Sequence, residues 1–254
     1  MSVPSKRALI FGSTGLTGSF VLSEAVNADQ YTEVVCFNRK DIPAQFPKQK
    51  NIVTTFTDLH MYGDVFTGAD VYCCLGTTNK QVNNNREAYY EADVARPYLI
   101  AKLAADYQAA SYTLQTAMGA NAKSSIFYNR LKGELEQQVM ALPLQALYIY
   151  RPSLLTGPRK EHRSGEIIGK RIMYMINPLL IGSLRKYRSI SCADVAKAMV
   201  ATALNKKGGT HIFLSDAIQA IADGKKKLNQ TVHLSNNLPL SRASAFVVSA
   251  KPKN

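Results

Sequence analysis

A tyrosine and a lysine four residues apart are the pair in this sequence whose types and spacing best suit proton transfer. Tyr128 and Lys132 lie in the stretch SSIFYNRLKGELEQ (124–137), which is typical of a helix. Because residues i and i+4 share one face of a helix, the Lys132 ammonium can lie near the Tyr128 phenol and near a ribose hydroxyl of a bound cofactor. A neighbouring cation favours the phenolate form of a group that otherwise titrates at about 10, so the pair suits general acid or base chemistry.

The spacing needs support from position, since a chain with 13 tyrosines contains roughly one such pair by chance. A second pair, Tyr98 and Lys102, lies on the helix that connects the fourth and fifth predicted strands. The apolar stripe of this helix indicates that it packs against the sheet. Tyr128 instead begins the helix after the fifth strand, where open parallel sheets bind ligands. The order of elements therefore favours the pair Tyr128 and Lys132; the structural alternative is a packed Tyr128 and a solvated Lys132.

Such a pair also needs a group that polarises the substrate oxygen. Thr116 ends the fifth predicted strand in LQTAMGAN and is the nearest hydroxyl by this topology. Ser124 and Ser125 are the alternatives. These assignments depend on the elements that position them.

Short apolar runs alternate with helical patterns along the chain. The runs that suit buried strands are 7–12, 33–38, 51–56, 70–76, 111–116 and 144–150. Helical patterns follow at 15–27, 86–108 and 124–141, and later at 165–177 and 192–205, before a short strand HIFLS. This alternation predicts an α/β fold, a Rossmann-type doubly wound parallel sheet with helices on both faces. We expect one domain, 1–223, whose range from about 152 to 222 forms a small cap over the sheet.

A glycine-rich loop joins the first predicted strand to the first helix. Its sequence, LIFGSTGLTGSFV, spaces three glycines three residues apart in the strand, turn and helix order of a dinucleotide site. Glycines let backbone N–H groups approach a phosphate closely, and the helix N-terminus behind them favours an anion. A merely structural glycine turn is the alternative. The predicted cofactor-binding residues of this loop are Gly12, Ser13, Thr14, Gly15, Leu16 and Gly18.

The end of the second predicted strand indicates which dinucleotide is bound. An acidic residue there suits the ribose 2′-hydroxyl of NAD, and a basic residue suits the 2′-phosphate of NADP. The stretch VVCFNRKD places Arg39 and Lys40 at this point, which favours NADP(H). In so basic a chain, a solvated loop is the alternative.

Two later strand ends complete the predicted cofactor site. Asp58 follows the third strand, where its carboxylate can accept a hydrogen bond from an adenine amino group or cap the next helix. Leu75 and Gly76 end the fourth strand in CCLGTT, and the missing side chain of Gly76 lets the backbone pass close to a ribose. Loop geometry alone can also explain this glycine.

The net charge of +13 is concentrated toward one end of the sequence. No acidic residue follows Asp223, whereas six lysines and arginines do. Because 224–254 also lacks a periodic apolar pattern, we expect a basic, flexible or weakly docked tail. A solvated tail is favoured over an anion-binding arm, so nucleic acid is not an expected partner.

Cysteines and apolar runs restrict the remaining classes of protein, namely metal-binding, secreted and membrane proteins. The four cysteines have no metal-ligand spacing, so no metal site is predicted, and they are typical of reduced core residues in a cytoplasmic protein. The first residues do not form a secretory signal, and the apolar stretch 172–184 is too short to span a membrane.

Several stretches resemble one known family when taken together. GSTGLTG, CCLGTT, AMGANAKSSIFYNRLKGELE, YRPSLLTGPRKEHRSGE and ISCADVAKAM are similar to the atypical short-chain dehydrogenases/reductases that include the Tat-interacting-protein oxidoreductases and their bacterial relatives, some of which are named nucleoside-diphosphate-sugar epimerases. The resemblance covers residues 7 to about 222. It implies a Rossmann-type fold that binds NADP(H), with Tyr128 and Lys132 as the dyad and Thr116 where the family carries a serine.

The same resemblance extends to the segment after the sixth predicted strand. There Arg159, Arg163 and Glu166 would line a pocket for an anionic or polar substrate, or else hold the cap together through an Arg to Glu pair. The polar run 79–87 suits a mobile lid or a plain surface loop.

These observations predict an NADP(H)-dependent oxidoreductase that acts on a small-molecule carbonyl or alcohol. The alternatives are a cofactor-binding regulatory protein with little catalysis, and an epimerase-like enzyme acting on a nucleotide sugar. Both a monomer and a homodimer are compatible with the sequence; the helices at 86–108 and 124–141 are the candidate dimer interface.

Overall fold

Seven parallel strands form the central sheet in a computed structural model that describes residues 6–78, 81–158, 177–205 and 207–225. Their order across the sheet is β3-β2-β1-β4-β5-β6-β9, and every neighbouring pair is parallel. The strands are β1 (Lys6–Phe11), β2 (Tyr31–Asn38), β3 (Gln49–Val53), β4 (Asp70–Cys73), β5 (Ser111–Gln115), β6 (Ala146–Arg151) and β9 (Gly209–Leu214). The predicted α/β fold of Rossmann type is confirmed.

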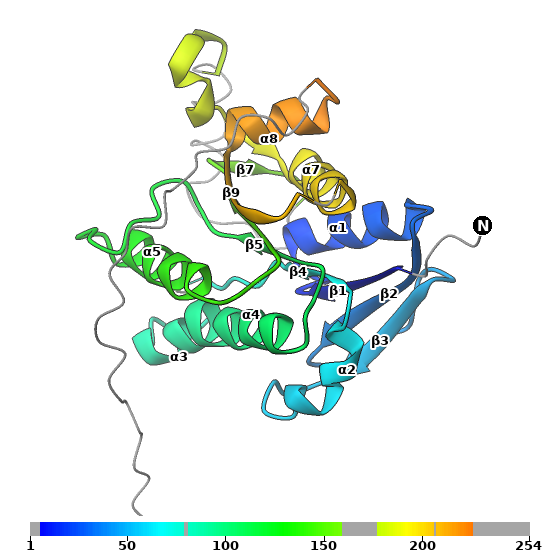
Figure 1. Ribbon diagram of the computed structural model, residues 1–254. Helices are drawn as coiled ribbons and strands as arrows, with labels where there is room; N and C mark the ends of the chain where they lie inside the picture. Colours follow the sequence, from blue (N-terminus) through cyan, green and yellow to red (C-terminus); the bar gives the residue numbers. More distant parts are fainter. Residues whose placement is uncertain (1–5, 79–80, 159–176, 206, 226–254) are drawn as a thin grey trace, which may run out of the picture.

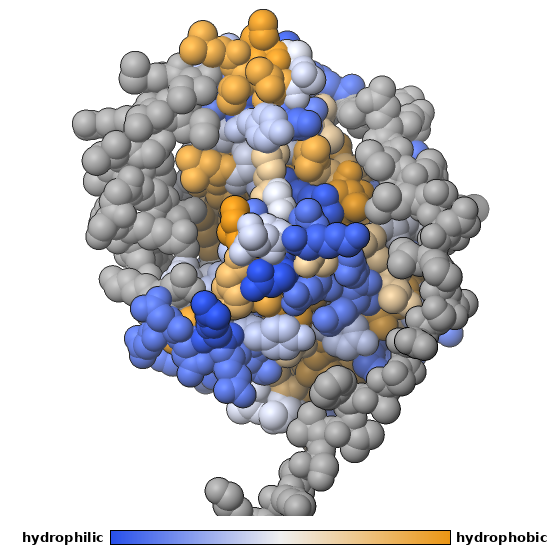
Figure 2. Space-filling model, turned by 90° about the vertical axis from the view of Figure 1, so that its left-hand side faces the viewer, coloured by the Kyte–Doolittle hydropathy of each residue, from blue (hydrophilic) through white to orange (hydrophobic). Residues whose placement is uncertain are grey.

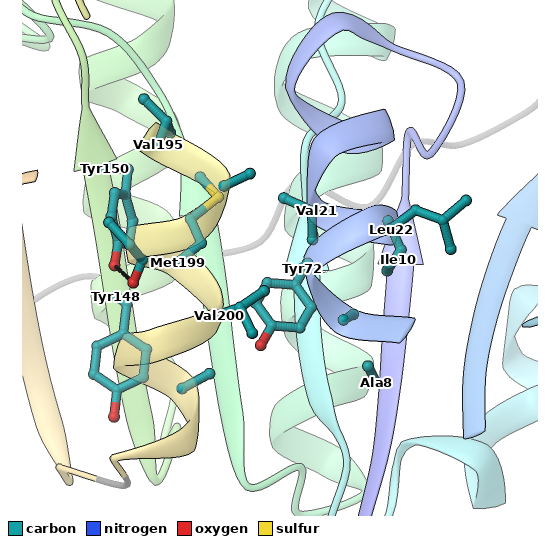
Figure 3. Close-up of a cluster of buried hydrophobic side chains, with 14 of the residues drawn as sticks. Ala8, Ile10, Val21, Leu22, Tyr72, Tyr148, Tyr150, Val195, Met199 and Val200 are labelled. Atoms are coloured by element: carbon teal, nitrogen blue, oxygen red, sulfur yellow. Dashed lines mark hydrogen bonds between the residues drawn. The ribbon is translucent and has the colours of Figure 1, made fainter. Parts of the chain in front are cut away.

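Helices cover both faces of this sheet (Figure 1). Residues of α1 (Leu16–Asn27), α7 (Cys192–Leu204) and α8 (Ser215–Ala222) join one buried cluster, part of which is drawn in Figure 3. Residues of α4 (Arg96–Asp106) and α5 (Phe127–Met140) join the other. Side chains alternate along each strand, so β1 contributes Ile10 to the first cluster and Leu9 to the second.

The adjacent cysteines follow the same alternation. Cys73 lies in the second cluster, whereas Cys74 packs against the first. All four cysteines are free thiols. Burial raises the pKa of the Cys36 thiol to about 11, as expected for a core residue rather than a reactive one.

The predicted helix 86–108 is divided in the structure. It consists of α3 (Arg86–Tyr90), a π-helical turn η2 (Glu91–Ala95) and α4. A π-helical turn adds a residue to the helical repeat and is often found at functional sites. Here the turn carries Asp93, which is buried.

Part of the range expected to cap the sheet belongs to the sheet itself. β9 pairs with β6 as the seventh strand, and α7 packs beside α1. A second, two-stranded parallel sheet joins β7 (Leu155–Thr156) to β8 (Ile190–Ser191). The short helical turns are η1 (Leu59–Tyr62), α2 (Gly63–Phe66), η3 (Asn177–Leu179) and η4 (Gly182–Tyr187).

Some predicted features lie outside the described residues. These are the helix at 165–177, nearly all of the basic tail, and the candidate substrate residues Arg159 and Arg163 with Glu166.

Candidate active site

Two adjoining cavities, of about 850 and 870 Å³, lie at the carboxyl ends of the central strands. They share lining residues from the loops after β1 and β4, among them Thr14, Gly15, Cys74, Leu75, Gly76 and Thr77. The strand order reverses between β1 and β4, which is where open α/β sheets bind ligands. Figure 2 views the molecule from this edge, where hydrophilic side chains gather across the middle of the face. We call the two cavities together the groove.

The glycine loop fits closely between β1, β4 and α1. Gly12 has a φ of +86°, and a Cβ atom on it would lie 2.9 Å from the Cys74 carbonyl oxygen. A Cβ atom on Gly18 would lie 2.0 Å from the Gly12 carbonyl oxygen. Both positions therefore require glycine for packing.

The N-terminus of α1 opens into the groove. Gly15 is the N-cap residue, and no side chain accepts a hydrogen bond from the first turn. Thr14, Gly15, Leu16 and Thr17 line the first cavity. Backbone N–H groups and the helix dipole at this end suit a phosphate.

The end of β2 carries one buried polar side chain followed by two exposed basic ones. Asn38 is buried and its Oδ1 accepts a hydrogen bond from Ser13 Oγ over 2.9 Å, which ties the strand end to the glycine loop. Arg39 and Lys40 are exposed and line the second cavity. Arg96 also lines this cavity, with its guanidinium 5.2 Å from the Phe56 ring centroid. Sequence reasoning did not identify Arg96.

Asp58 lies beside η1 rather than against the groove. Its Oδ1 accepts a hydrogen bond from Thr54 Oγ1 over 2.5 Å, and this bond lowers the pKa of the Asp58 carboxyl. Asp58 is not among the described residues that line either cavity, and its side chain makes no cap bond to η1. The predicted adenine contact therefore has no support from its present position.

Tyr128 and Lys132 both line the first cavity, together with Thr116. Tyr128 is 39% exposed, whereas Lys132 is 4% exposed and lies with its Nζ 5.9 Å from the Tyr128 ring centroid. The pair that topology favoured thus lies at the groove. Tyr98 of the rival pair packs against the second core cluster, and Lys102 pairs with Asp106 on the exposed side of α4.

Lys132 is held by a carboxylate from η2. Its Nζ lies 2.9 Å from Asp93 Oδ2, and Asp93 Oδ1 accepts a hydrogen bond from the Thr77 N–H over 2.6 Å. Burial by itself would lower the pKa of Lys132. The charge of Asp93 and the electrostatic effect of the nearby Tyr128 outweigh burial and raise this pKa. Lys132 therefore stays an ammonium beside the phenol.

The position of Asp93 in the sequence is a signal for a buried acidic residue. Tyr89, Asp93 and Pro97 are spaced four residues apart, and all three are buried. An acidic residue at a buried position of a helical stripe requires a partner. The pattern alone could not name Lys132 as that partner.

Thr116 belongs to a buried network under the groove. Its Oγ1 donates to Glu136 Oε1 over 2.6 Å, so in this structure the hydroxyl hydrogen is directed to Glu136. Arg151 Nε lies 3.0 and 3.1 Å from the two carboxylate oxygens of Glu136, and Arg151 Nη2 forms an ion pair with the same carboxylate. Tyr128, Lys132 and Glu136 share one face of α5 at intervals of four residues.

The remaining candidate residues from the sequence contribute less to the groove. Ser124 and Ser125 precede α5 and are not among the described lining residues of the groove. Of the polar run 79–87, Gln81 lines both cavities.

Within the described residues, no cluster of three or more histidine, cysteine or acidic side chains could hold a metal. No helix in the described ranges is both long and apolar enough to cross a bilayer.

Comparisons with known proteins agree with this architecture. No protein-family model matches the sequence. Protein HTATIP2 of Rattus norvegicus is 30% identical over 173 residues, which cover 66% of this chain and 70% of that protein. Protein FMP52, mitochondrial, of Eremothecium gossypii is 31% identical over 159 residues, 62% of this chain and 70% of the relative.

Solved structures share the fold at low sequence identity. MoeE5 in complex with UDP-glucose and NAD has a TM-score of 0.60 and 13% identity, covering 86% of this chain and 81% of that one. The oxidoreductase ylbE from Lactococcus lactis has a TM-score of 0.57 and 17% identity, covering 86% and 95%. With the identity and coverage of the curated relatives, this chain belongs to the HTATIP2 and FMP52 family of atypical short-chain dehydrogenases/reductases.

Proposed function

We propose that this protein is an NADP(H)-dependent oxidoreductase that transfers hydride between its cofactor and a carbonyl or alcohol substrate. The observation that carries the proposal is the position of Tyr128 and the buried Lys132 in the same groove as the glycine loop. The glycine loop suits a dinucleotide, and the pair suits proton transfer. Structural neighbours support a nicotinamide cofactor, since MoeE5 was solved with NAD.

The residues present fit such a cofactor. The α1 N-terminus would hold the pyrophosphate, because Gly15 leaves the first-turn N–H groups without a side-chain cap. A Cβ atom on Gly76 would meet no atom within 4 Å, so the space beside this glycine is open to a ligand rather than filled by protein. When bound, the cofactor supplies or accepts the hydride.

Arg39 and Lys40 support NADP(H) over NAD(H). Both side chains are exposed at the end of β2, where the adenosine ribose is held in Rossmann-type folds. A 2′-phosphate beside them would form charge-assisted hydrogen bonds, which are stronger than neutral ones.

The protein's own residues would move one proton. In the reductive direction, Tyr128 Oη donates its proton to the substrate oxygen as hydride reaches the substrate carbon. The phenolate that remains lies beside the Lys132 ammonium, whose charge Asp93 maintains. Since Tyr128 is 39% exposed, solvent can return the proton.

Calorimetric titration with NADPH and, separately, with NADH tests the proposal. Tight binding of NADPH and much weaker binding of NADH is the expected result. Binding of neither, on folded protein freed of carried-over nucleotide, would refute the oxidoreductase and favour a partner-binding role. NADPH binding without turnover on any carbonyl would favour the cofactor-binding regulatory alternative.

We propose the cytoplasm as the compartment, on the basis of the reduced core cysteines. Several fungal relatives carry the name mitochondrial, so fractionation of cells expressing the full chain is the test.

A further inference from the structure

At the end of β5, the Thr116 hydroxyl offers the groove an acceptor rather than a donor. Glu136 is 1% exposed and is paired through both oxygens with Arg151, so it is a carboxylate that only accepts hydrogen bonds. The other neighbour of the Thr116 hydroxyl, the Tyr150 carbonyl oxygen at 3.4 Å, is also an acceptor. The single hydroxyl hydrogen of Thr116 is therefore used inside the protein, and its lone pairs remain for the groove.

A second residue of the same strand end gives an independent observation. Gln115 lines the first cavity, and its Oε1 is buried without a hydrogen-bond partner. Buried polar atoms in native proteins are rarely left unpaired, so an atom of this kind on a residue that lines a cavity points to a ligand that pairs with it. As an acceptor, it calls for a donor on that ligand.

From this geometry we infer that the substrate carries at least one hydroxyl group beside its reacting carbon. The inference rests on the proposed function, because Tyr128 takes the reacting oxygen. The reacting oxygen cannot also donate hydrogen bonds to Thr116 and Gln115. As a carbonyl it has no hydrogen, and as an alcohol its single hydrogen is the one exchanged with Tyr128. Neighbouring hydroxyls supply the missing donors, so the substrate class is an α-hydroxy carbonyl compound in reduction and the corresponding vicinal diol in oxidation.

A plain ketone would leave the acceptors of Thr116 and Gln115 desolvated and unpaired. Sites built to hydrogen-bond a substrate hydroxyl strongly reject analogues that lack it. The hydroxyl-bearing substrate should thus be preferred by at least about tenfold in kcat/KM.

Two pairs of probes, matched in shape, test this preference with the full chain and NADPH. Hydroxyacetone is compared with 2-butanone, and 2-hydroxycyclohexanone with 2-methylcyclohexanone, because a methyl group replaces the hydroxyl in each pair. The expected result is faster reduction of the hydroxylated member of each pair. Equal rates, or faster reduction of the methyl compounds, would overturn the inference.

Variants link the preference to these residues. Thr116→Val removes the hydroxyl at constant shape, and Thr116→Ser keeps it. The preference should fall by about tenfold in T116V and in Gln115→Met, and persist in T116S. An unchanged preference in T116V and Q115M, on variants whose melting shows folded protein, would also overturn the inference.

A binding measurement separates this inference from the proposed function. Saturation-transfer NMR of the four probes, with protein saturated in NADP⁺ so that no reduction occurs, should show contact from the hydroxylated probes only. Failure of NADP⁺ itself to bind refutes the proposed function. Normal NADP⁺ binding with no selectivity among the probes refutes only the substrate class.

Discussion

The Asp93 carboxylate lies 2.9 Å from the Lys132 ammonium, and both side chains are almost fully buried. Asp93 comes from the π-helical turn η2 and Lys132 from α5, so the pair joins the two helical segments on one face of the sheet. The second oxygen of Asp93 accepts from the Thr77 backbone in the loop after β4. One carboxylate thus fixes both Lys132 and a loop that lines the groove.

Removing this carboxylate should destabilise the protein strongly. Asp93→Leu leaves the Lys132 charge buried and unpaired, and breaking a buried pair in this way costs about 3–5 kcal/mol in free energy of unfolding. Urea denaturation measures the change. Asp106→Leu is the matched control, because its pair with Lys102 is exposed on α4 and should contribute far less to stability. Similar losses in the two variants would contradict the role given to Asp93.

Alkaline pH should weaken the same pair. The folded-state pKa of Lys132 lies above its ordinary value of 10.5, because Asp93 outweighs the opposite effect of burial. A raised lysine pKa gives stability that is fully present below pH 10.5 and is lost as the pH rises through the folded value. The stability difference between wild type and Asp93→Asn should therefore be large at neutral pH and narrow on the alkaline side. Urea midpoints measured from pH 7 to 12 test this; a constant difference would count against it.

Gly18 and Gly76 should respond differently to alanine. Gly18→Ala places a Cβ atom 2.0 Å from the Gly12 carbonyl oxygen, so it should lower the melting temperature of the protein without cofactor. Gly76→Ala meets no protein atom within 4 Å and should leave that melting temperature nearly unchanged, while weakening NADPH binding. Thermal melts with and without NADPH distinguish the two. Unchanged NADPH affinity in G76A would mean that the cofactor does not pass close to this residue.

The sequence was sufficient for features that are local in the chain. The alternation of apolar runs predicted the strands from β1 to β6, and the glycine spacing predicted the loop between β1 and α1. Order along the chain was also enough to prefer Tyr128 over Tyr98.

Features that depend on distant residues could not be predicted in this way. Asp93 and Lys132 are 39 positions apart, and only the packing of η2 against α5 shows that they pair. The hydrogen bond from Thr116 to Glu136 likewise joins a strand end to a helix, and it directs the hydroxyl hydrogen to Glu136 rather than to the substrate oxygen that Thr116 was expected to polarise. The two-residue strands β7 and β8 are too short to give any periodicity.

The choice between NADPH and NADH should depend on Arg39. Arg39→Ala removes the charge-assisted hydrogen bonds expected to the 2′-phosphate, which are worth about 1.5–3 kcal/mol, so NADPH affinity should fall by roughly tenfold or more. NADH affinity should change little. Lys50→Ala removes the same charge from an exposed side chain that pairs with Glu33, and it serves as the control in calorimetric titration. Equal losses for NADPH and NADH in R39A would show that Arg39 does not recognise the 2′-phosphate.

Turnover should depend on the Tyr128 hydroxyl while cofactor binding should not. Tyr128→Phe keeps the ring at the groove but removes the proton that would be transferred, so kcat should fall by about a hundred- to ten-thousand-fold with NADPH affinity nearly intact. Tyr98→Phe is the matched control, since Tyr98 belongs to the other tyrosine and lysine pair and packs against the second core cluster. Steady-state rates on 2-hydroxycyclohexanone, together with calorimetric titration of NADPH, separate catalysis from binding. Equal turnover in Y128F and wild type would show that Tyr128 is not the proton donor, because the variant has no hydroxyl at this position.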